Sequence, residues 1–231
     1  MNTSTDEQAW AAAVNTETKR YPENERGGFV ICGANWGGEP PNPATYVPDE
    51  PSFFSDPKVS DYPYRNKLLS WFDLLGHPLS RDVAGPFERS IVQTNWLSGA
   101  HYQSRRVDGD LLSYCREPQM VEDVVRRFRL LQPRLILFAS ATVFNAFVCV
   151  SESFGDTLGA PVGSVETAWC RPPTSGSRSA RAMLARFGKC NVMGLPHPTG
   201  QAAVANASIL SFRPLLSPII SDFRARLVSH Q

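Results

Sequence analysis

The sequence lacks the cysteine pairs and the long apolar runs that mark several classes of protein. Its five cysteines are odd in number and include no C-x-x-C pair, which argues against a disulfide framework, a zinc site and an iron–sulfur cluster. The most apolar window, residues 135–150, is too short to span a membrane and contains Ser140, Thr142 and Asn145. The start, MNTSTDEQAW, does not have the basic-then-apolar order of a signal peptide. We therefore expect a cytoplasmic protein that contacts no membrane and needs no metal or other cofactor.

Acidic residues are missing from one long stretch of the chain. Residues 167–221 contain no Asp or Glu but contain six basic residues, namely Arg171, Arg178, Arg181, Arg186, Lys189 and Arg213. Residues 1–166 carry 15 basic and 21 acidic residues, although the formal net charge of the whole chain is only +1. A positive segment on a mildly acidic body is typical of a surface that binds phosphate, and a solvated basic face is the alternative. We expect Arg178, Arg181 and Arg186 to contact phosphate groups.

Helical and strand-like patterns alternate along the 231 residues, whose 42% hydrophobic content is enough for one substantial core. Apolar runs predict strands at residues 29–32, 90–94, 135–138 and 191–195, and helical spacing predicts helices near 68–75, 118–132 and 141–150. Residues 155–179 are rich in Gly, Pro and Ser, and no strand or helix is assigned to them. The alternation favours a single α/β domain over residues 1–231 with a mainly parallel sheet.

Hydrogen-bonding side chains follow three of the predicted strands. Asn35, Asn95 and His197 stand just after the first, second and fourth of them. Each has an ordinary reading, because asparagine caps turns and a histidine before proline is often a satisfied loop residue. Ligands of open α/β sheets bind beyond the carboxyl ends of the strands, so together the three residues predict a polar pocket. Asparagine is neither acid nor base near neutral pH, so a catalytic Asn35 would hold something else in place, most simply a water.

The same residues resemble motifs of the uracil-DNA glycosylase superfamily. Gly33-Ala34-Asn35-Trp36-Gly37 is similar to the asparagine form of its first motif, as found in single-strand-selective uracil glycosylases and mismatch thymine/uracil glycosylases. Asn95, which closes SIVQTN, resembles the asparagine that reads the flipped base. LPHPTGQ, residues 195–201, resembles the second motif. The matches follow the order of the family and span residues 29–201, most of the chain.

This resemblance implies a three-layer α/β/α sandwich with a central four-stranded, mainly parallel sheet of order 2-1-3-4. It implies a monomeric DNA glycosylase that hydrolyses the N-glycosidic bond of a flipped pyrimidine and leaves an abasic site, without a metal. Asn35 would orient the attacking water, and His197 would donate a hydrogen bond to pyrimidine O2 as charge develops on the leaving base. Thr199, Gly200 and Gln201 would contact DNA, and Gln201 stands where many members carry a leucine wedge.

The resemblance also names residues around the base. Family members stack the base on an aromatic residue after the first motif, and Phe53 or Phe54 is the nearest candidate, although either phenylalanine also suits a core position. Trp36 stands where proline is usual. Gly37 stands where the members most restricted to uracil carry tyrosine, so nothing there excludes a substituent at C5. The amide of Asn95 can pair with uracil or, rotated, with cytosine. The expected substrate is uracil or a C5-modified pyrimidine such as a hydroxymethylcytosine derivative, in base excision repair or in defence against modified phage DNA.

Two other functions stay open at this point. A glycosylase-like fold could bind nucleic acid without cutting it, since fold does not imply activity. An α/β enzyme could also hydrolyse free nucleosides or nucleotides. The three polar residues at strand ends favour an enzyme over the first alternative, and the acid-free basic segment favours a polymeric substrate over the second.

Overall fold

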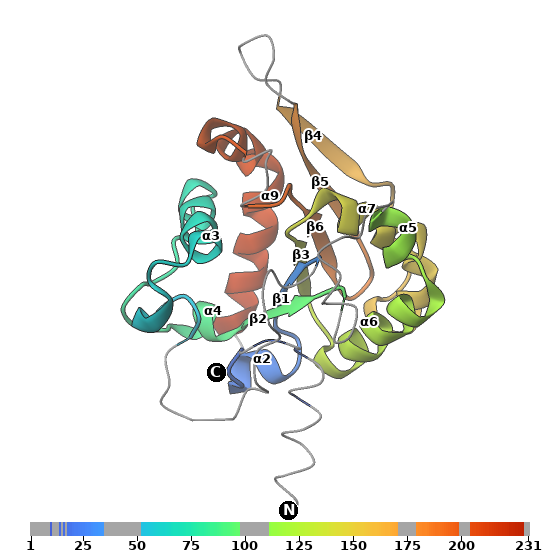
Figure 1. Cartoon of the computed structure of the whole chain (residues 1–231), viewed down its shortest axis with the longest axis horizontal. Coiled ribbons are helices and arrows are strands. Elements are labelled where there is room, and N and C mark those ends of the chain that lie inside the picture. Colours follow the sequence, from blue (N-terminus) through green and yellow to red (C-terminus); the bar gives the residue numbers. More distant parts are fainter. Residues whose placement is uncertain are drawn as a thin grey trace, which may run out of the picture.

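Six strands form one mixed sheet in the computed structural model, which describes residues 10, 14, 16, 18–34, 52–97, 111–170, 179–198 and 204–228. The strands are β1 (Phe29–Gly33), β2 (Ile91–Asn95), β3 (Leu135–Phe138), β4 (Glu166–Cys170), β5 (Ala180–Arg186) and β6 (Asn191–Gly194). Their order in the sheet is β2-β1-β3-β6-β5-β4. The chain is therefore an α/β protein with a mostly parallel core (Figure 1).

The parallel part of the sheet consists of the four strands that the sequence predicts. β1 pairs in parallel with β2 on one side and with β3 on the other, and β3 pairs in parallel with β6. Counted along the predicted strands, this is the order 2-1-3-4. All positions of β1, β2 and β3 are buried. Burial on both faces explains why β1 and β3 read as continuous apolar runs, whereas β2 is apolar only at Ile91 and Val92.

The expectation of a four-stranded sheet is wrong because the sheet continues through β5 and β4. Both are antiparallel to their neighbours, and β4 lies within residues 155–179, to which no strand was assigned. β5 reads ARAMLAR, and most of these residues are strong helix formers. Its strand state follows from pairing with β6 and from the burial of residues 182–185, so local propensity gives no signal for it.

Helices cover both faces of the sheet: α3, α4 and α9 lie on one face, and α5, α6, α7 and α8 lie on the other (Figure 1). The helices are α2 (Pro22–Glu25), α3 (Pro63–Leu74), α4 (Pro86–Arg89), α5 (Leu111–Cys115), α6 (Pro118–Leu131), α7 (Ala141–Cys149), α8 (Gly155–Leu158) and α9 (Asn206–Val228), with short 3-10 helices at Pro57–Val59 and Ser151–Phe154. Within this described part of the chain, no helix is both long and apolar enough to cross a membrane.

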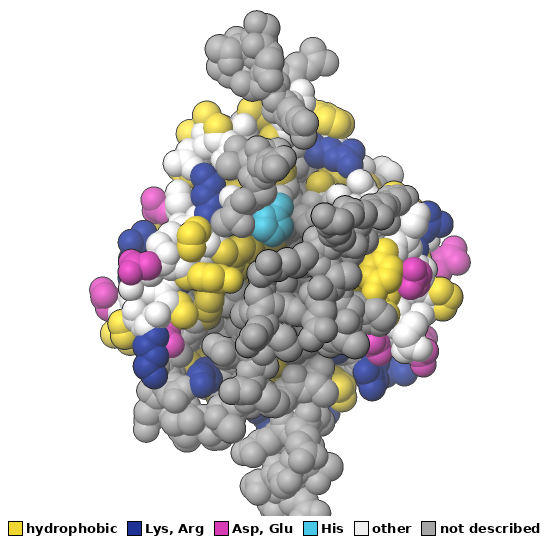
Figure 2. Space-filling model, in the orientation of Figure 1, with side chains coloured by type: hydrophobic (Ala, Val, Ile, Leu, Met, Phe, Trp, Pro, Cys, Tyr) yellow, Lys and Arg dark blue, Asp and Glu magenta, His cyan; other side chains and the backbone are white. Residues whose placement is uncertain are grey.

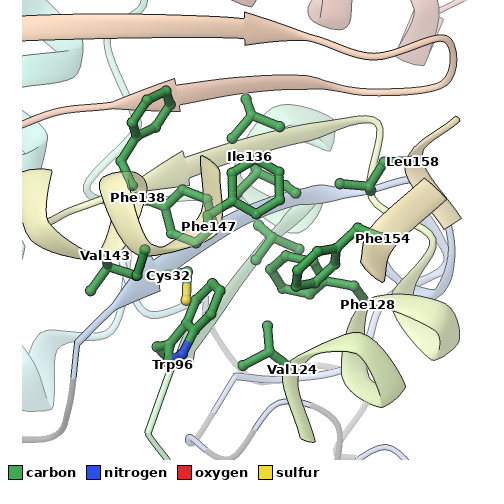
Figure 3. Close-up of a cluster of buried hydrophobic side chains, with 14 of the residues drawn as sticks. Cys32, Trp96, Val124, Phe128, Ile136, Phe138, Val143, Phe147, Phe154 and Leu158 are labelled. Carbon is green, nitrogen blue, oxygen red and sulfur yellow. The ribbon is translucent and has the colours of Figure 1, made fainter. Parts of the chain in front are cut away.

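Aromatic rings fill the space on each side of the sheet. On the side of α6 and α7, Phe147 packs against Phe138 and Phe154 with ring centroids 5.2 Å apart in both pairs (Figure 3). On the side of α3 and α9, Phe29 of β1 packs against Phe72 at 5.8 Å. All five side chains are at most 2% exposed. Each face of the sheet is thus packed against its own hydrophobic core.

One edge of the sheet is covered by threonine hydroxyls. Thr16 and Thr18 donate hydrogen bonds to the carbonyl oxygen of Gln93 in β2, at 2.6 and 3.2 Å. The amide of Gln93 donates to Thr18 Oγ1 at 3.0 Å. These contacts satisfy backbone groups that an edge strand otherwise leaves open. The other edge of the described sheet is β4, whose side chains are exposed or half-buried.

A buried histidine that follows the carboxyl end of α3 forms a hydrogen bond to α9. His77 is 5% exposed, and its Nε2 lies 3.0 Å from both the carbonyl oxygen and the hydroxyl of Ser217. A carbonyl oxygen only accepts, so Nε2 carries the proton and donates it. Burial is the main cause that lowers the pKa of His77 below 6.5, with Arg224 and Arg213 acting in the same direction and the Ser217 bond opposing it.

We predict that His77 makes the protein less stable as the pH falls below about 6.5. The unfolded chain binds more protons than the folded chain between the unfolded pKa and the lowered folded pKa, so the free energy of unfolding decreases in that window. The contribution is at most about 1.4 kcal/mol per pH unit. Urea unfolding between pH 7 and pH 5 should show a steeper loss for the wild type than for His77→Gln. Equal slopes would contradict the assignment.

Candidate functional site

The parallel strands end at one edge of the sheet, and two of the predicted site residues lie there. Gly33 of β1 is paired with Asn95 of β2, and each closes its strand. β6 ends at Gly194, opposite Phe138 of β3, and His197 follows three residues later. Because parallel strands share a direction, the ends of β1, β2 and β6 meet at the same edge. This carboxyl edge is the candidate site.

The amide of Asn95 is held over Gly33. Asn95 is 7% exposed, and a Cβ atom on Gly33 would stand only 2.7 Å from its Oδ1. Real Cβ atoms do not approach an oxygen so closely, so the position needs glycine for space and not for an unusual backbone angle. The missing side chain of Gly33 therefore makes the room that the Asn95 amide occupies.

A buried arginine fixes the backbone of this strand end. Arg127 of α6 is 3% exposed, and its guanidinium donates hydrogen bonds to Thr94 Oγ1 at 3.2 Å, to the carbonyl oxygen of Asn95 and to that of Trp96 at 2.7 Å. Its Nε donates to the carbonyl oxygen of Asp123 within α6. Burial lowers the pKa of Arg127 below its usual range, yet a guanidinium stays charged near neutral pH. The guanidinium therefore binds three successive residues: the last two of β2 and Trp96, which follows the strand.

Trp96 anchors the same segment in the core. Its indole Nε1 donates a hydrogen bond to the carbonyl oxygen of Cys115 at 2.9 Å, and its backbone amide donates one to the carbonyl oxygen of Gly33 at 2.8 Å. The ring is fully buried and packs against Phe138 and Phe154 at 5.7 and 6.1 Å (Figure 3). The residue after Asn95 is thus immobilised on both its backbone and its side chain, which leaves Asn95 little freedom at the edge.

His197 lies in the open part of the site. It is exposed, and a histidine is visible on the face shown in Figure 2, whereas the following residue, Pro198, is buried. Its ring centroid lies 6.2 Å from that of Tyr64, at an angle of 48°. Desolvation of part of the ring lowers the pKa of His197 below 6.5. At pH 7 the imidazole is therefore neutral, with one nitrogen that donates and one that accepts.

The two predicted phenylalanines have different surroundings. Phe54 is 1% exposed and belongs to the core on the side of α3 and α9, whereas Phe53 is half-buried. Phe53 packs edge-on against Phe54 at 5.3 Å and against Tyr62 at 6.2 Å. The buried guanidinium of Arg65 donates to the carbonyl oxygens of both phenylalanines. Phe53 is the one of the pair with a side chain available at the surface.

Tyr64 is a site residue that the sequence analysis did not select. It is half-buried at the start of α3, directly after Pro63, and burial raises the pKa of its hydroxyl. The crossover from β1 to β2 brings this end of α3 to the carboxyl edge, as the contact with His197 shows. Pro63 marks the first turn of a helix, but the local sequence does not indicate that Tyr64 contacts His197.

Arg127 was also missed, although its place in α6 was readable. The predicted helix buries Val124, Phe128 and Leu131, and Arg127 falls at helical spacing within that apolar stripe. An arginine in a buried stripe needs acceptors for its donors, and buried carbonyl oxygens at a strand end supply them. The sequence gives the position of the charge but not the identity of the acceptors.

Two of the three arginines predicted to contact phosphate, Arg181 and Arg186, are described, and they do not lie together. Arg181 and Arg186 stand at opposite ends of β5, and their odd separation turns their side chains to opposite faces. Arg181 donates from Nη2 to Asn145 Oδ1 of α7 at 3.2 Å, and Arg186 forms an ion pair with Glu166 of β4. Arg181 is near the carboxyl edge, whereas Arg186 is opposite Asn191, at the start of β6. The structure therefore separates the two predicted contacts.

Several predicted site residues lie outside the described residues. They are Asn35, Trp36, Gly37, Arg178, Thr199, Gly200 and Gln201. Ala34, the residue before Asn35, is 9% exposed, and its carbonyl oxygen accepts a hydrogen bond from the amide of Leu97 at 2.9 Å. Among the residues that are described, no group of three or more His, Cys, Asp or Glu side chains could hold a metal ion.

A cleft of about 520 Å³ lies away from this edge. Its lining includes Arg134 and Lys189, which precede β3 and β6 and therefore mark the amino edge of the sheet. Lys189 Nζ donates to the carbonyl oxygen of Asp156 at 3.1 Å. The cleft contains none of the predicted site residues, so its size does not make it part of the candidate site.

We predict that Arg127→Met lowers the free energy of unfolding by about 3 kcal/mol, because the carbonyl oxygens of Asn95 and Trp96 lose their donors while buried. Arg127→Lys should restore only part of this loss, since an ammonium cannot span the fork. Arg126 is the matched control: its side chain is 70% exposed and pairs with Asp123, so Arg126→Met should change stability by less than about 0.5 kcal/mol. Urea unfolding measures all three, and similar losses at both positions would argue against the role of Arg127.

Comparison with known proteins adds no relative. No protein-family model matches this chain, and no curated protein matches it. The resemblance to the uracil-DNA glycosylase superfamily therefore rests on the short motifs.

Proposed function

We propose that the protein is a monofunctional DNA glycosylase that hydrolyses the N-glycosidic bond of a flipped pyrimidine. The observation that carries this proposal is the side-chain amide of Asn95, which lies over Gly33 at the carboxyl edge. The backbone carbonyl oxygen of Asn95 accepts a hydrogen bond from Arg127, so the strand end that carries the amide is held in place. An amide offers both a donor and an acceptor, which suits the hydrogen-bonding edge of a pyrimidine. His197 stands at the same edge beside the aromatic ring of Tyr64.

The chemistry requires a water, a leaving base and no resident cofactor. The bond between C1′ and the base nitrogen breaks, water supplies a hydroxyl to C1′, and its proton ends on the departing base. Negative charge develops on the pyrimidine as it leaves, and a neutral His197 can donate a hydrogen bond to its O2. Asn35 orients the water in this scheme, because an amide positions without taking part in proton transfer.

A flipped base loses its stacking partners in the duplex, and aromatic side chains of the protein can replace them. Phe53 is half-buried, whereas Phe54 is enclosed in the core, so Phe53 is the better stacking partner of the two. Tyr64 is half-buried beside His197 and is a second candidate for the wall of the pocket. Gly37 in the first motif has no side chain to exclude a substituent at C5, so the proposed substrates are uracil and C5-modified pyrimidines.

We expect purified protein to create alkali-labile sites in at least one of four oligonucleotides, which carry uracil, a thymine mismatch, 5-hydroxymethylcytosine or its glucosylated form. Single-turnover rates should fall about 10²-fold in Asn35→Ala and His197→Ala, with binding of an abasic product nearly unchanged. Strand breaks in none of the four, with binding retained, would indicate a non-catalytic nucleic-acid-binding protein. Base release from free nucleosides alone would indicate a nucleoside hydrolase.

A second prediction uses the space at Gly33. Gly33→Ala places a Cβ 2.7 Å from Asn95 Oδ1 and must displace the amide, so the excision rate should fall by about 10²-fold while most of the stability is kept. Gly155→Ala is the matched control, since a Cβ there meets nothing within 4 Å. Single-turnover excision and the urea midpoint should be measured for both. An excision rate in Gly33→Ala equal to that of Gly155→Ala would exclude the Asn95 amide from base recognition.

A further inference from the structure

The hairpin of β4 and β5 extends past the carboxyl edge of the sheet. β5 runs antiparallel to β6, and Met183 is its residue opposite Gly194, where β6 ends. Residues 180–182 of β5 therefore continue beyond β6, and they stay paired with residues 168–170 of β4. Figure 1 shows β4 and β5 side by side at the top of the view. We call residues 168–170 and 180–182 the arm, and it rises from the edge that holds Asn95 and His197.

The arm presents an exposed tryptophan beside an arginine. Trp169 is 61% exposed, whereas Trp10, Trp71 and Trp96 are at most 8% exposed. Trp169 is the direct cross-strand partner of Arg181, whose guanidinium carbon lies 5.5 Å from the centre of the indole ring. Arg181 is itself held by its hydrogen bond to Asn145 of α7. One face of the indole therefore carries a fixed cation, and much of the ring remains open to solvent.

Charge identifies the kind of partner that this arm fits. Residues 167–221 include the whole arm and contain no acidic residue. The nearest acidic residue before this segment is Glu166, at the other end of β4. Such a segment attracts anions, and an open indole beside a cation offers a base a stacking surface and a phosphate a counter-charge. In a duplex the faces of the bases are already stacked on one another, so the partner that can use the indole is an unpaired nucleotide.

We propose that Trp169 and Arg181 form a platform that binds unpaired nucleotides of a DNA strand, with a base stacked on Trp169 and a phosphate beside Arg181. The platform rests on the proposed function in one respect, because it is the binding surface for the strand that supplies the flipped base. Stacking does not depend on the identity of the base, so the platform binds single-stranded DNA without a lesion. This separates its test from the test of base excision.

The first test uses a fifteen-residue oligothymidine and the fluorescence of tryptophan. Binding should quench the emission of the wild type, and Trp169→Phe should lose most of the quenching while binding within about threefold of the wild type, because phenylalanine still stacks. Trp169→Ala should bind about tenfold more weakly by fluorescence anisotropy. Leu130→Ala, which removes a 47% exposed apolar side chain from α6, should bind like the wild type.

The second test measures charge. Arg181→Ala should weaken oligothymidine binding and reduce the slope of log affinity against log salt by about 0.7, the value for one lost phosphate contact on a single strand. Arg126→Ala is the matched control, since it removes an exposed arginine of α6 that is paired with Asp123. Its slope should equal that of the wild type.

Any one of three results in the DNA-binding tests would overturn the platform: oligothymidine affinity unchanged in both Trp169→Ala and Arg181→Ala, full quenching in Trp169→Phe, or a Trp169→Ala defect confined to duplex DNA. Dissociation of a dimer in Trp169→Ala, with DNA binding intact, would assign the indole to a second copy of the chain and would also overturn it. Trp169-dependent quenching without base excision would support the platform and leave the proposed function without support. Base excision without Trp169-dependent binding would support the proposed function and overturn the platform.

Discussion

The end of β2 depends on the fork of hydrogen bonds from Arg127. Its guanidinium is buried with the side chains of α6, and its donors reach Thr94, Asn95 and Trp96 in succession. Without these donors, two backbone carbonyl oxygens would be buried unsatisfied, at a cost of about 1 to 3 kcal/mol each. Trp96 belongs to the core and Asn95 to the edge, so the same cation joins the packing of the protein to the geometry of the candidate site. Arg65 holds the carbonyl oxygens of Phe53 and Phe54 in a similar way on the other face.

The parallel part of the fold was predictable because apolar residues mark its strands: β1 and β3 are continuous apolar runs, and β2 and β6 each contain two adjacent apolar residues. The position of Asn95 at a strand end was also predictable, since the predicted second strand stops just before it and parallel strands end together. β5 was not, because its alanines and arginines favour a helix and only pairing with β6 makes it a strand. Tyr64 was not either, since its contact with His197 joins residues far apart in the sequence. Local patterns indicate elements and strand ends, whereas contacts across the edge depend on the whole sheet.

The carboxyl edge connects the two proposals. In the proposed function, the amide of Asn95 and the neutral imidazole of His197 serve the edge and the leaving group of one base. The arm of β4 and β5 offers an indole and a guanidinium, which suit a neighbouring nucleotide in any sequence. A polymeric substrate needs both kinds of contact, because nonspecific binding of the strand brings the base to the residues that read it. Gly33 is paired with Asn95, the last residue of β2, and Met183, where the arm begins, is opposite Gly194, the last residue of β6. Both regions therefore start at the ends of parallel strands.

The proposed function requires that water attack the sugar carbon of a pyrimidine nucleotide held at this edge. Excision in water enriched in oxygen-18, followed by mass spectrometry of both products, tests this requirement. We expect one heavy oxygen on C1′ of the abasic strand and none in the released base, with Gly33→Ala and His197→Ala forming both products much more slowly. Heavy oxygen in the base would mean attack on the ring, and release of no base from any pyrimidine substrate would contradict the proposed function.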